Sequence, residues 1–245
     1  MENRDFTTII RAITFIVPVY NERDTLLYIL KKIEDTDLGL KKEIIIVDDC
    51  SNDGTRELIE GLDGDFVKLY HQKNQGKGAA IRTAVKSATG DLVIVQDADL
   101  EYDPEDIKAM LVPILKSGAD VVYGSRFVPS GPSRVLFFWH MVGNKFLTLL
   151  TNMVSNINLT DMETCYKLFK REVITAIPIE ENRFGFEPEI TIKLCQRGAV
   201  LYEVGISYHG RTYAEGKKIG WRDGLHALRC IFKYGITRRL ISKFW

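Results

Sequence analysis

The sequence predicts an α/β protein built on a mostly parallel, doubly wound sheet. Strand-like and helix-like segments alternate through the first half of the 245-residue chain. The strand-like segments are almost entirely apolar, which is typical of strands that helices cover on both faces. Apolar residues make up 45% of the chain and charged residues 27%, an ordinary balance for a globular protein with a core. Sheets of this kind bind ligands beyond the carboxyl ends of their strands.

Five apolar runs in the first half predict strands, at residues 12–20, 43–49, 65–72, 91–96 and 120–125. The helices between them are predicted from apolar spacing and capping signals, near Asn21, after SNDGT (51–55), at NQGKG (74–78) and at Asp103-Pro104. At the last of these, aspartate caps the helix and proline takes its first position. Pro113 is expected to kink this helix or end it early.

The second half of the chain is less regular. Residues 134–157 predict a long, apolar and partly amphipathic helix. Polar residues interrupt it, so it is too polar for a membrane span. A strand-like segment (162–169), a helix (185–198) and a strand (199–208) follow. After a polar loop, a basic amphipathic helix is expected from about Ile219.

Charge is unevenly distributed, although the chain is neutral overall. Residues 205–245 contain nine Lys/Arg against two acidic residues, so the remaining residues carry an equal negative excess. A basic C-terminal segment on an acidic body favours an anionic partner, such as phosphates or a membrane surface.

The cysteines and the N-terminus suggest where such a chain would work. The four cysteines are scattered and form no CxxC pair, which argues against a zinc site or disulfide framework and suits a reducing compartment. His71 and His226 are expected to have packing or surface roles. The segment MENRDFTTIIR lacks a long apolar core, so we do not expect a signal peptide.

Two acidic residues, Asp97 and Asp99, end the fourth predicted strand with a single residue between them. Their side chains can converge on one point, and hard divalent cations take oxygen ligands. A cation between two acids and a diphosphate offsets both sets of negative charge. The alternative is an acidic turn that caps the next helix, a role that Asp103 already fills. The position at the end of a buried strand favours the metal site.

Other polar clusters follow the strands and leave alternatives open. Asp48 and Asp49 suit a nucleotide's ribose or base edge, whereas the alternative is an Asx-type turn formed by Asp49, Ser51 and Asp53. The N–H groups of NQGKG (74–78) could favour an anion, although the glycines equally suit tight turns. The basic loop at 209–218 either folds over the crevice to neutralise a diphosphate or is a solvated surface loop. Asp161 either points into the site or caps a turn.

In this order along the chain, the motifs resemble those of family 2 glycosyltransferases with a GT-A fold. The resemblance is carried by PVYNE (18–22), VDDCSNDGT (47–55), NQGKGAAIRTA (74–84), DLVIVQDADLEYDP (91–104), GSRF (124–127), DMETCYKLF (161–169), FEPEITIKL (186–194) and HGRTYAEGKKI (209–219). Within the family, the chain is most similar to polyprenyl-phosphate sugar transferases, including dolichol-phosphate mannosyl- and glucosyltransferases. It departs from the mannosyltransferases at Glu163–Lys167, where they often have Ser-Gly-Phe-Arg, and in its RTYAEGKK loop, so mannose is not implied.

The resemblance implies an inverting, metal-dependent transferase that moves a hexose from a UDP- or GDP-sugar to a polyprenyl phosphate. Magnesium or manganese would be held by Asp97 and Asp99, with Asp99 the first choice as direct ligand. The donor would contact Pro18, Tyr20, Glu22, Asp49, Asp97 and Gln96, and the basic loop would add Lys217 and Lys218. Arg126 and Arg211 would face donor or acceptor phosphates. Asp161 would orient the acceptor, or act as a base for a hydroxyl acceptor.

The resemblance also implies a single domain, 1–245, with a nucleotide-sugar-binding half (about 12–125), an acceptor-binding half (about 126–235) and a basic tail (236–245). Membrane contact would be peripheral, at the cytoplasmic face. No nucleic-acid partner is expected, and homo-oligomer formation stays open. The alternatives are a transferase with a hydroxyl acceptor in surface polysaccharide synthesis and a non-catalytic nucleotide-sugar-binding subunit.

Overall fold

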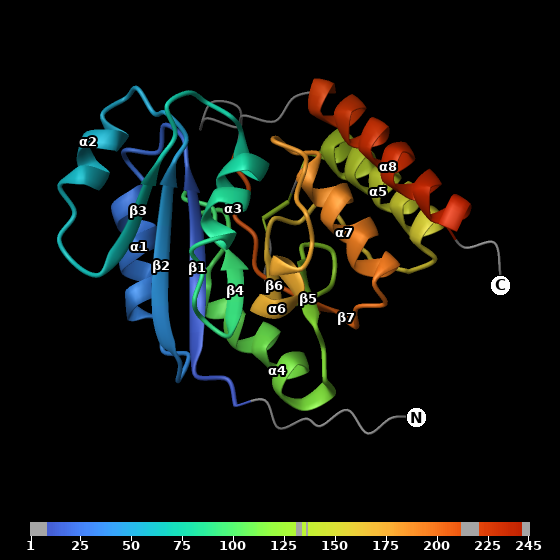
Figure 1. The fold of residues 1–245 in the computed structure, drawn as a ribbon, viewed down its shortest axis with the longest axis horizontal. Coiled ribbons are helices and arrows are strands. Elements are labelled where there is room, and N and C mark those ends of the chain that lie inside the picture. Colours follow the sequence, from blue (N-terminus) through green and yellow to red (C-terminus); the bar gives the residue numbers. More distant parts are fainter. Residues whose placement is uncertain (1–8, 131–133, 136, 212–220, 242–245) are drawn as a thin grey trace.

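A seven-stranded sheet forms the centre of the computed structural model, which describes residues 9–130, 134–135, 137–211 and 221–241 (Figure 1). The strands lie in the order β3-β2-β1-β4-β6-β5-β7, with bounds β1 Ala12–Val19, β2 Lys41–Asp48, β3 Phe66–Tyr70, β4 Leu92–Val95, β5 Val121–Ser125, β6 Lys167–Lys170 and β7 Leu201–Gly205. All pairings within the sheet are parallel except those of β6 with β4 and β5. The prediction of a mostly parallel α/β sheet is confirmed.

Helices cover both faces of this sheet. Their bounds are α1 Leu26–Asp35, α2 Thr55–Glu60, α3 Lys77–Val85, η1 Pro104–Asp106, α4 Ile107–Ser117, α5 Phe138–Ser155, α6 Arg171–Thr175, α7 Phe186–Gln196 and α8 Trp221–Ile241. Side chains of α1, α2 and α4 pack on one face, and those of α3, α6 and α7 on the other. α5 and α8 lie side by side against α7 and form an outer layer (Figure 1).

The central strand β1 shows why the strands of this sheet are apolar throughout. Phe15 and Val17 belong to the cluster that packs on the α1 face, whereas Ile16 belongs to the cluster on the α3 face. Successive side chains of a strand point to opposite faces, and here both faces are covered. All three side chains are completely buried.

Several element bounds differ from the sequence prediction. α4 does not end at Pro113 but continues to Ser117, and it ends where Gly118 adopts a left-handed conformation with φ 69°. Pro113 and Ile114 are both buried, and we attribute the continuation to this packing, which offsets the one backbone hydrogen bond that proline cannot donate. The strand predicted at 162–169 is limited to Lys167–Lys170. The predicted C-terminal helix begins at Trp221 and includes residues 236–241 of the expected tail.

The reversed strand β6 determines which loops meet. Because β6 runs against β4 and β5, the segment before its first residue, Lys167, lies at the edge where β4 and β5 end. Residues 161–166 therefore join the loops after β4 and β5. Among the helices of the described ranges, none combines the length and apolar character needed to cross a bilayer.

Candidate active site

The acid pair after β4 is held by two basic side chains from distant parts of the chain. Lys77 is the first residue of α3, and its Nζ lies 2.6 Å from Oδ1 and 2.7 Å from Oδ2 of Asp97. Arg211, which follows β7, donates from Nη2 to Oδ2 of Asp99 at 2.9 Å. In this state each acid therefore has its own counter-ion.

The acid pair suits a divalent cation because its negative charge is concentrated and partly desolvated. Burial, followed by the charges of Asp97 and Glu101, raises the pKa of Asp99 to about 7, while Arg211 opposes the rise. A set of carboxylate oxygens is what magnesium and manganese take in proteins. These residues fit such a cation, and Asp97 and Asp99 would hold it.

Arg211 connects the acid pair to the loop after β1. Its guanidinium lies 3.2 Å and 3.3 Å from the carboxylate oxygens of Glu22, and its backbone N–H donates to Oε1 of Glu101 at 2.7 Å. The hydroxyl of Tyr208 donates to the other oxygen of Glu101 at 2.8 Å. The structure thus brings the predicted residues Glu22, Asp99 and Arg211 together. Glu101 was not predicted, although it lies only two residues after Asp99.

Asp49 lies deeper than the acid pair and is engaged by three groups. His71 Nδ1 is 2.7 Å from Oδ1, and the N–H groups of Gln75 and Gly76 donate to Oδ1 at 2.8 Å and to Oδ2 at 2.7 Å. The Asp49 side chain therefore anchors the NQGKG loop at the end of β2. Its direct contact with a donor stays a prediction, as do those of Pro18 and the exposed Tyr20.

The glycines of the NQGKG loop allow a second loop to approach closely. A Cβ at Gly76, where φ is 95°, would lie 2.5 Å from the carbonyl oxygen of Asn182. A Cβ at Gly78 would lie 2.3 Å from that of Glu181. The interpretation of these glycines as structural is supported, and their packing brings Lys77 to Asp97.

Gln96 does not present its side chain to an open site. It is completely buried, and its amide donates to the carbonyl oxygens of Asp97 and Tyr102. Its Oε1 accepts a hydrogen bond from the hydroxyl of Tyr166 at 3.0 Å. These contacts support the turn that carries the acid pair, and a role of Gln96 near a donor stays a prediction.

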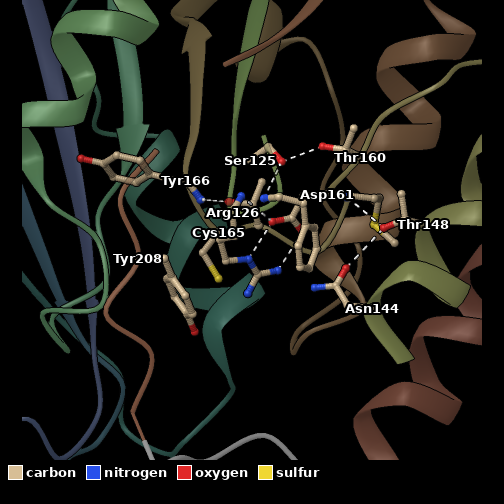
Figure 2. Close-up of polar contacts among 12 residues, drawn as sticks. Ser125, Arg126, Asn144, Thr148, Thr160, Asp161, Cys165, Tyr166 and Tyr208 are labelled. Atoms are coloured by element: carbon tan, nitrogen blue, oxygen red, sulfur yellow. Dashed lines mark hydrogen bonds and ion pairs between the residues drawn. The ribbon is translucent and has the colours of Figure 1, made fainter. Parts of the chain in front are cut away.

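Arg126, which follows β5, forms a bidentate ion pair with Asp161, which lies in the loop before β6 (Figure 2). Nε and Nη2 of Arg126 lie 2.6 Å and 2.7 Å from the two carboxylate oxygens, and the backbone N–H of Arg126 donates to the same carboxylate at 3.1 Å. Asp161 is 0% exposed. Since both carboxylate oxygens are engaged, this geometry suits an orienting role of Asp161 better than that of a base.

A small hollow of about 40 Å³ lies beside Arg126. Its walls are mainly aromatic and come from the loop after β5, from the start of α5 and from Tyr208; they comprise Phe127, Phe137, His140, Met141, Asn144 and Tyr208. The guanidinium of Arg126 lies 5.2 Å from the centre of the Tyr208 ring. The hollow therefore combines a cationic group with an apolar wall.

Glu163, also from the loop before β6, is a further acidic residue near Arg126 that was not predicted. Burial, followed by the charge of Glu187, raises its pKa to about 8. Its Oε1 is buried and accepts no hydrogen bond from the residues that the structure describes. Nothing in the sequence signals this environment, because it depends on how the loop packs against α7.

Two predicted site residues, Lys217 and Lys218, lie outside the described residues. The part of the basic loop that is described, residues 209–211, turns toward the acid pair, since the N–H of His209 donates to the carbonyl oxygen of Glu101 at 3.0 Å. Residues 212–218 of the loop lie outside the described residues, so its role as a cover of the crevice stays a prediction.

The fold is shared with solved structures of glucosyl-3-phosphoglycerate synthase from Mycobacterium tuberculosis. The complex of that protein with UDP aligns with a TM-score of 0.71 at 18% identity, over 92% of this chain and 80% of that one. The complex with Mn²⁺, UDP-glucose and phosphoglyceric acid aligns with a TM-score of 0.70 at 19% identity, over the same shares. This likeness concerns the fold alone, and the prediction of a GT-A type fold is confirmed.

Curated relatives are more similar in sequence. The chain is 30% identical over 217 residues to dolichol-phosphate mannosyltransferase from Pyrococcus furiosus, an alignment of 84% of this chain and 60% of that protein. It is 28% identical over 223 residues to undecaprenyl-phosphate 4-deoxy-4-formamido-L-arabinose transferase from Aeromonas hydrophila, over 89% and 64% of the two chains. The chain thus spans about three fifths of the length of these relatives. A family model described as glycosyl transferase family 2 matches residues 14–177, and the chain belongs to that family.

Proposed function

We propose that this chain is an inverting, metal-dependent transferase that moves a hexose from a UDP- or GDP-sugar to a polyprenyl phosphate at the cytoplasmic face of a membrane. The observation that carries the proposal is the presence of two separate polar sites at one edge of the sheet. One is the acid pair Asp97 and Asp99, and the other is the cationic hollow at Arg126. The names of the relatives support a polyprenyl-phosphate acceptor.

Tyr208 links the two sites and so fixes their relative position. Its hydroxyl donates to Glu101 beside the acid pair, and its ring lies under the guanidinium of Arg126. A donor diphosphate at the acid pair and an acceptor phosphate at Arg126 would then lie on opposite sides of this ring. Such preorganisation favours direct attack, because orientation lowers the barrier of a two-substrate reaction.

The acceptor phosphate needs little activation by the protein. Its second pKa is about 6, so it is a dianion near neutrality, and its oxygen can attack the anomeric carbon without a general base. A new bond forms between that oxygen and the carbon while the bond to the nucleoside diphosphate breaks, which inverts the configuration. Arg211 would neutralise the departing diphosphate. A divalent cation bound by Asp97 and Asp99 would neutralise the same charge.

An exposed apolar stripe on α5 supports a membrane-bound acceptor. Its residues recur three and four positions apart, on one face of the helix: Trp139, Val142, Phe146, Leu149 and Met153. Trp139 is 78% exposed and Met153 69%. The neighbouring face carries Leu147, Leu150 and Val154, which pack in the cluster with α7 and α8. Since the hollow at Arg126 opens at the start of α5, a lipid surface against this stripe would deliver the acceptor phosphate to it.

The proposal is tested by incubating the chain with labelled UDP- and GDP-sugars, Mg²⁺ or Mn²⁺ and a polyprenyl phosphate in detergent. The expected product is a lipid-linked sugar whose formation stops with EDTA and with Asp99→Asn. Transfer to a free sugar hydroxyl but not to the lipid would refute the proposed acceptor. Donor binding without transfer or hydrolysis would instead indicate a non-catalytic binding subunit.

A hydroxyl acceptor is the second candidate, and Glu163 is the observation that favours it. A hydroxyl needs a general base, and a carboxyl group with a pKa near 8 is suited to accept its proton. The same incubation with a sugar alcohol in place of the lipid distinguishes the candidates. Loss of transfer in Glu163→Gln would accompany a hydroxyl acceptor but not a phosphate acceptor.

A further inference from the structure

Three side chains of metal-ligating type meet away from the acid pair, where α8 packs beside the loop before α7. They are Glu181, His226 and Cys230, and one ligating atom of each lies within 4.8 Å of those of the others. His226 Nε2 is 3.3 Å from Oε2 of Glu181 and 4.0 Å from Sγ of Cys230. His226 and Cys230 are four residues apart on α8, so they share one face of the helix.

We propose that Glu181, His226 and Cys230 form a transition-metal site that takes Zn²⁺ and fastens α8 to the loop before α7. Zinc is bound tetrahedrally, at about 2.0 Å from nitrogen and oxygen and about 2.3 Å from sulfur, which places ligand nitrogen and oxygen about 3.3 Å apart and nitrogen and sulfur about 3.5 Å apart. The nitrogen–oxygen separation already has this value, and the nitrogen–sulfur separation needs only a small rotation of the side chains.

The mixed ligand set selects the metal class. Thiolate and imidazole favour zinc over magnesium, which takes oxygen ligands and retains water. Cys230 is 1% exposed. Its thiol must lose its proton to bind a metal, as metal binding to cysteine generally requires.

The carboxylate of Glu181 is oriented by its neighbours. Its Oε1 accepts a hydrogen bond from the hydroxyl of Tyr234 at 2.7 Å and lies 3.0 Å from Nζ of Lys233, whereas Oε2 faces His226. Outer contacts of this kind fix the ligand atoms of metal sites. Gly185 contributes space, because a Cβ there would lie 2.7 Å from Sγ of Cys230.

Acidic and basic side chains both surround the three ligands. Glu180, Glu181 and Glu189 supply three negative charges, and Lys193 and Lys233, which bridge them, supply two positive charges. An open hollow of about 470 Å³, lined by Glu181 and His226, gives a metal ion access from solvent. Lys73 and Arg183 also line the hollow beside Glu181 and His226.

The sequence pattern without a CxxC pair predicted no zinc site and gave His226 a packing or surface role. The four cysteines are scattered and free, so cysteines alone form no zinc site among the described residues. A site made of one cysteine, one histidine and one glutamate escapes a search for cysteine pairs. Its third ligand lies 45 residues before the His–Cys pair and reaches it only through the packing of α8.

The test is a titration of the full chain, freed of metal with EDTA, with Co²⁺ as a spectroscopic stand-in for Zn²⁺. We expect one equivalent to produce the charge-transfer absorption of a Co²⁺–thiolate bond, and Zn²⁺ to abolish it by displacement. Cys230→Ser should remove the band, whereas Cys165→Ser and Cys195→Ser should retain it as matched controls. Tyr234→Phe should weaken the affinity about tenfold, because it leaves Glu181 less well oriented.

Two results would overturn the site: the absence of a thiolate band in the wild type, or a band of equal intensity in Cys230→Ser. If Cys230→Ser does not fold, His226→Gln decides in its place, since this side chain is partly exposed, and an unchanged Co²⁺ affinity refutes the proposal. Oxygen ligands produce no thiolate band, so cation binding at Asp97 and Asp99 does not affect this result. The test is independent of glycosyl transfer.

Discussion

Lys77 and Asp97 form an ion pair in which the Lys77 ammonium is within 2.7 Å of both carboxylate oxygens. Both side chains are largely buried, 14% and 16% exposed. A lysine in this position balances the acid while no metal is bound, and it competes with a metal for the same oxygens. The pair therefore affects both the stability of the protein and its affinity for a divalent cation.

We expect Lys77→Met to destabilise the metal-free protein by about 2 kcal/mol, because it leaves Asp97 partly buried beside Asp99 without its counter-ion. Mg²⁺ should raise the melting temperature more in the variant than in the wild type, since the competing ammonium is gone. Thermal unfolding with and without Mg²⁺ measures both effects. Lys86→Met, at an exposed position at the end of the same helix, is the control and should change neither. An equal Mg²⁺ response in Lys77→Met would contradict the competition.

Replacement of Arg211 should lower kcat even when lysine keeps the positive charge. Both Nη1 and Nη2 of its guanidinium donate to Glu22, and Nη2 also donates to Asp99, a forked geometry that an ammonium cannot reproduce. We expect Arg211→Lys to lower kcat about tenfold and Arg211→Ala about a hundredfold, measured as lipid-linked product per unit time. A fully active Arg211→Lys would show that the charge suffices and that the fork geometry has no role.

Asp161 and Arg126 should behave as a coupled unit. Asp161→Asn leaves a buried guanidinium without its counter-ion, and we expect it to lower the free energy of unfolding by about 3 kcal/mol. The double variant Arg126→Met/Asp161→Asn should be less destabilised than the sum of the single variants Arg126→Met and Asp161→Asn. Urea unfolding of the four proteins gives the coupling energy. Additive effects would mean that the two side chains stabilise the fold separately.

Glu163 should make the stability of the protein depend on pH. Its pKa in the folded state is about 8 and its ordinary value is 4.5, so between these values the folded protein binds more protons than the unfolded chain. The contribution of Glu163 to stability therefore falls as pH rises from about 4.5 to 8. Relative to the wild type, Glu163→Gln should gain stability across this window, on the order of 1 kcal/mol, because the side chain is partly exposed. Chemical unfolding at pH 5 and pH 8 checks this, and a difference that does not grow with pH would contradict it.

The apolar stripe on α5 should mediate binding to lipid. We expect Trp139→Glu to reduce cosedimentation with vesicles of phosphatidylglycerol and phosphatidylcholine about tenfold or more, because a carboxylate replaces a large exposed indole at the surface. Leu115→Glu is the matched control, since Leu115 is 54% exposed on α4, and it should bind as the wild type does. If Trp139→Glu instead dissociates a dimer and vesicle binding is unchanged, the stripe contacts a second copy of the chain.

The sequence predicted the features that depend on local pattern. The strands before Asp49 and Asp97 were placed within a few residues, because apolar runs and turn signals are local. The reversal of β6 could not be predicted, since a four-residue strand carries no sign of its direction. The pairing of Lys77 with Asp97 was missed for a similar reason. It depends on the close approach of the NQGKG loop to residues 181–183, which lie a hundred positions away.

The position of β6 between β4 and β5 has a consequence for the order of folding. Strands β1 to β4 pair with one another, and only β4 also pairs with a later strand, β6. These four strands can therefore pair during translation. β5, in contrast, has neither neighbour until β6 and β7 are synthesised, more than 40 residues later. An apolar strand whose two edges stay unpaired in the nascent chain is prone to aggregation. We therefore expect β5 to be the segment of the nascent chain that depends most on chaperones.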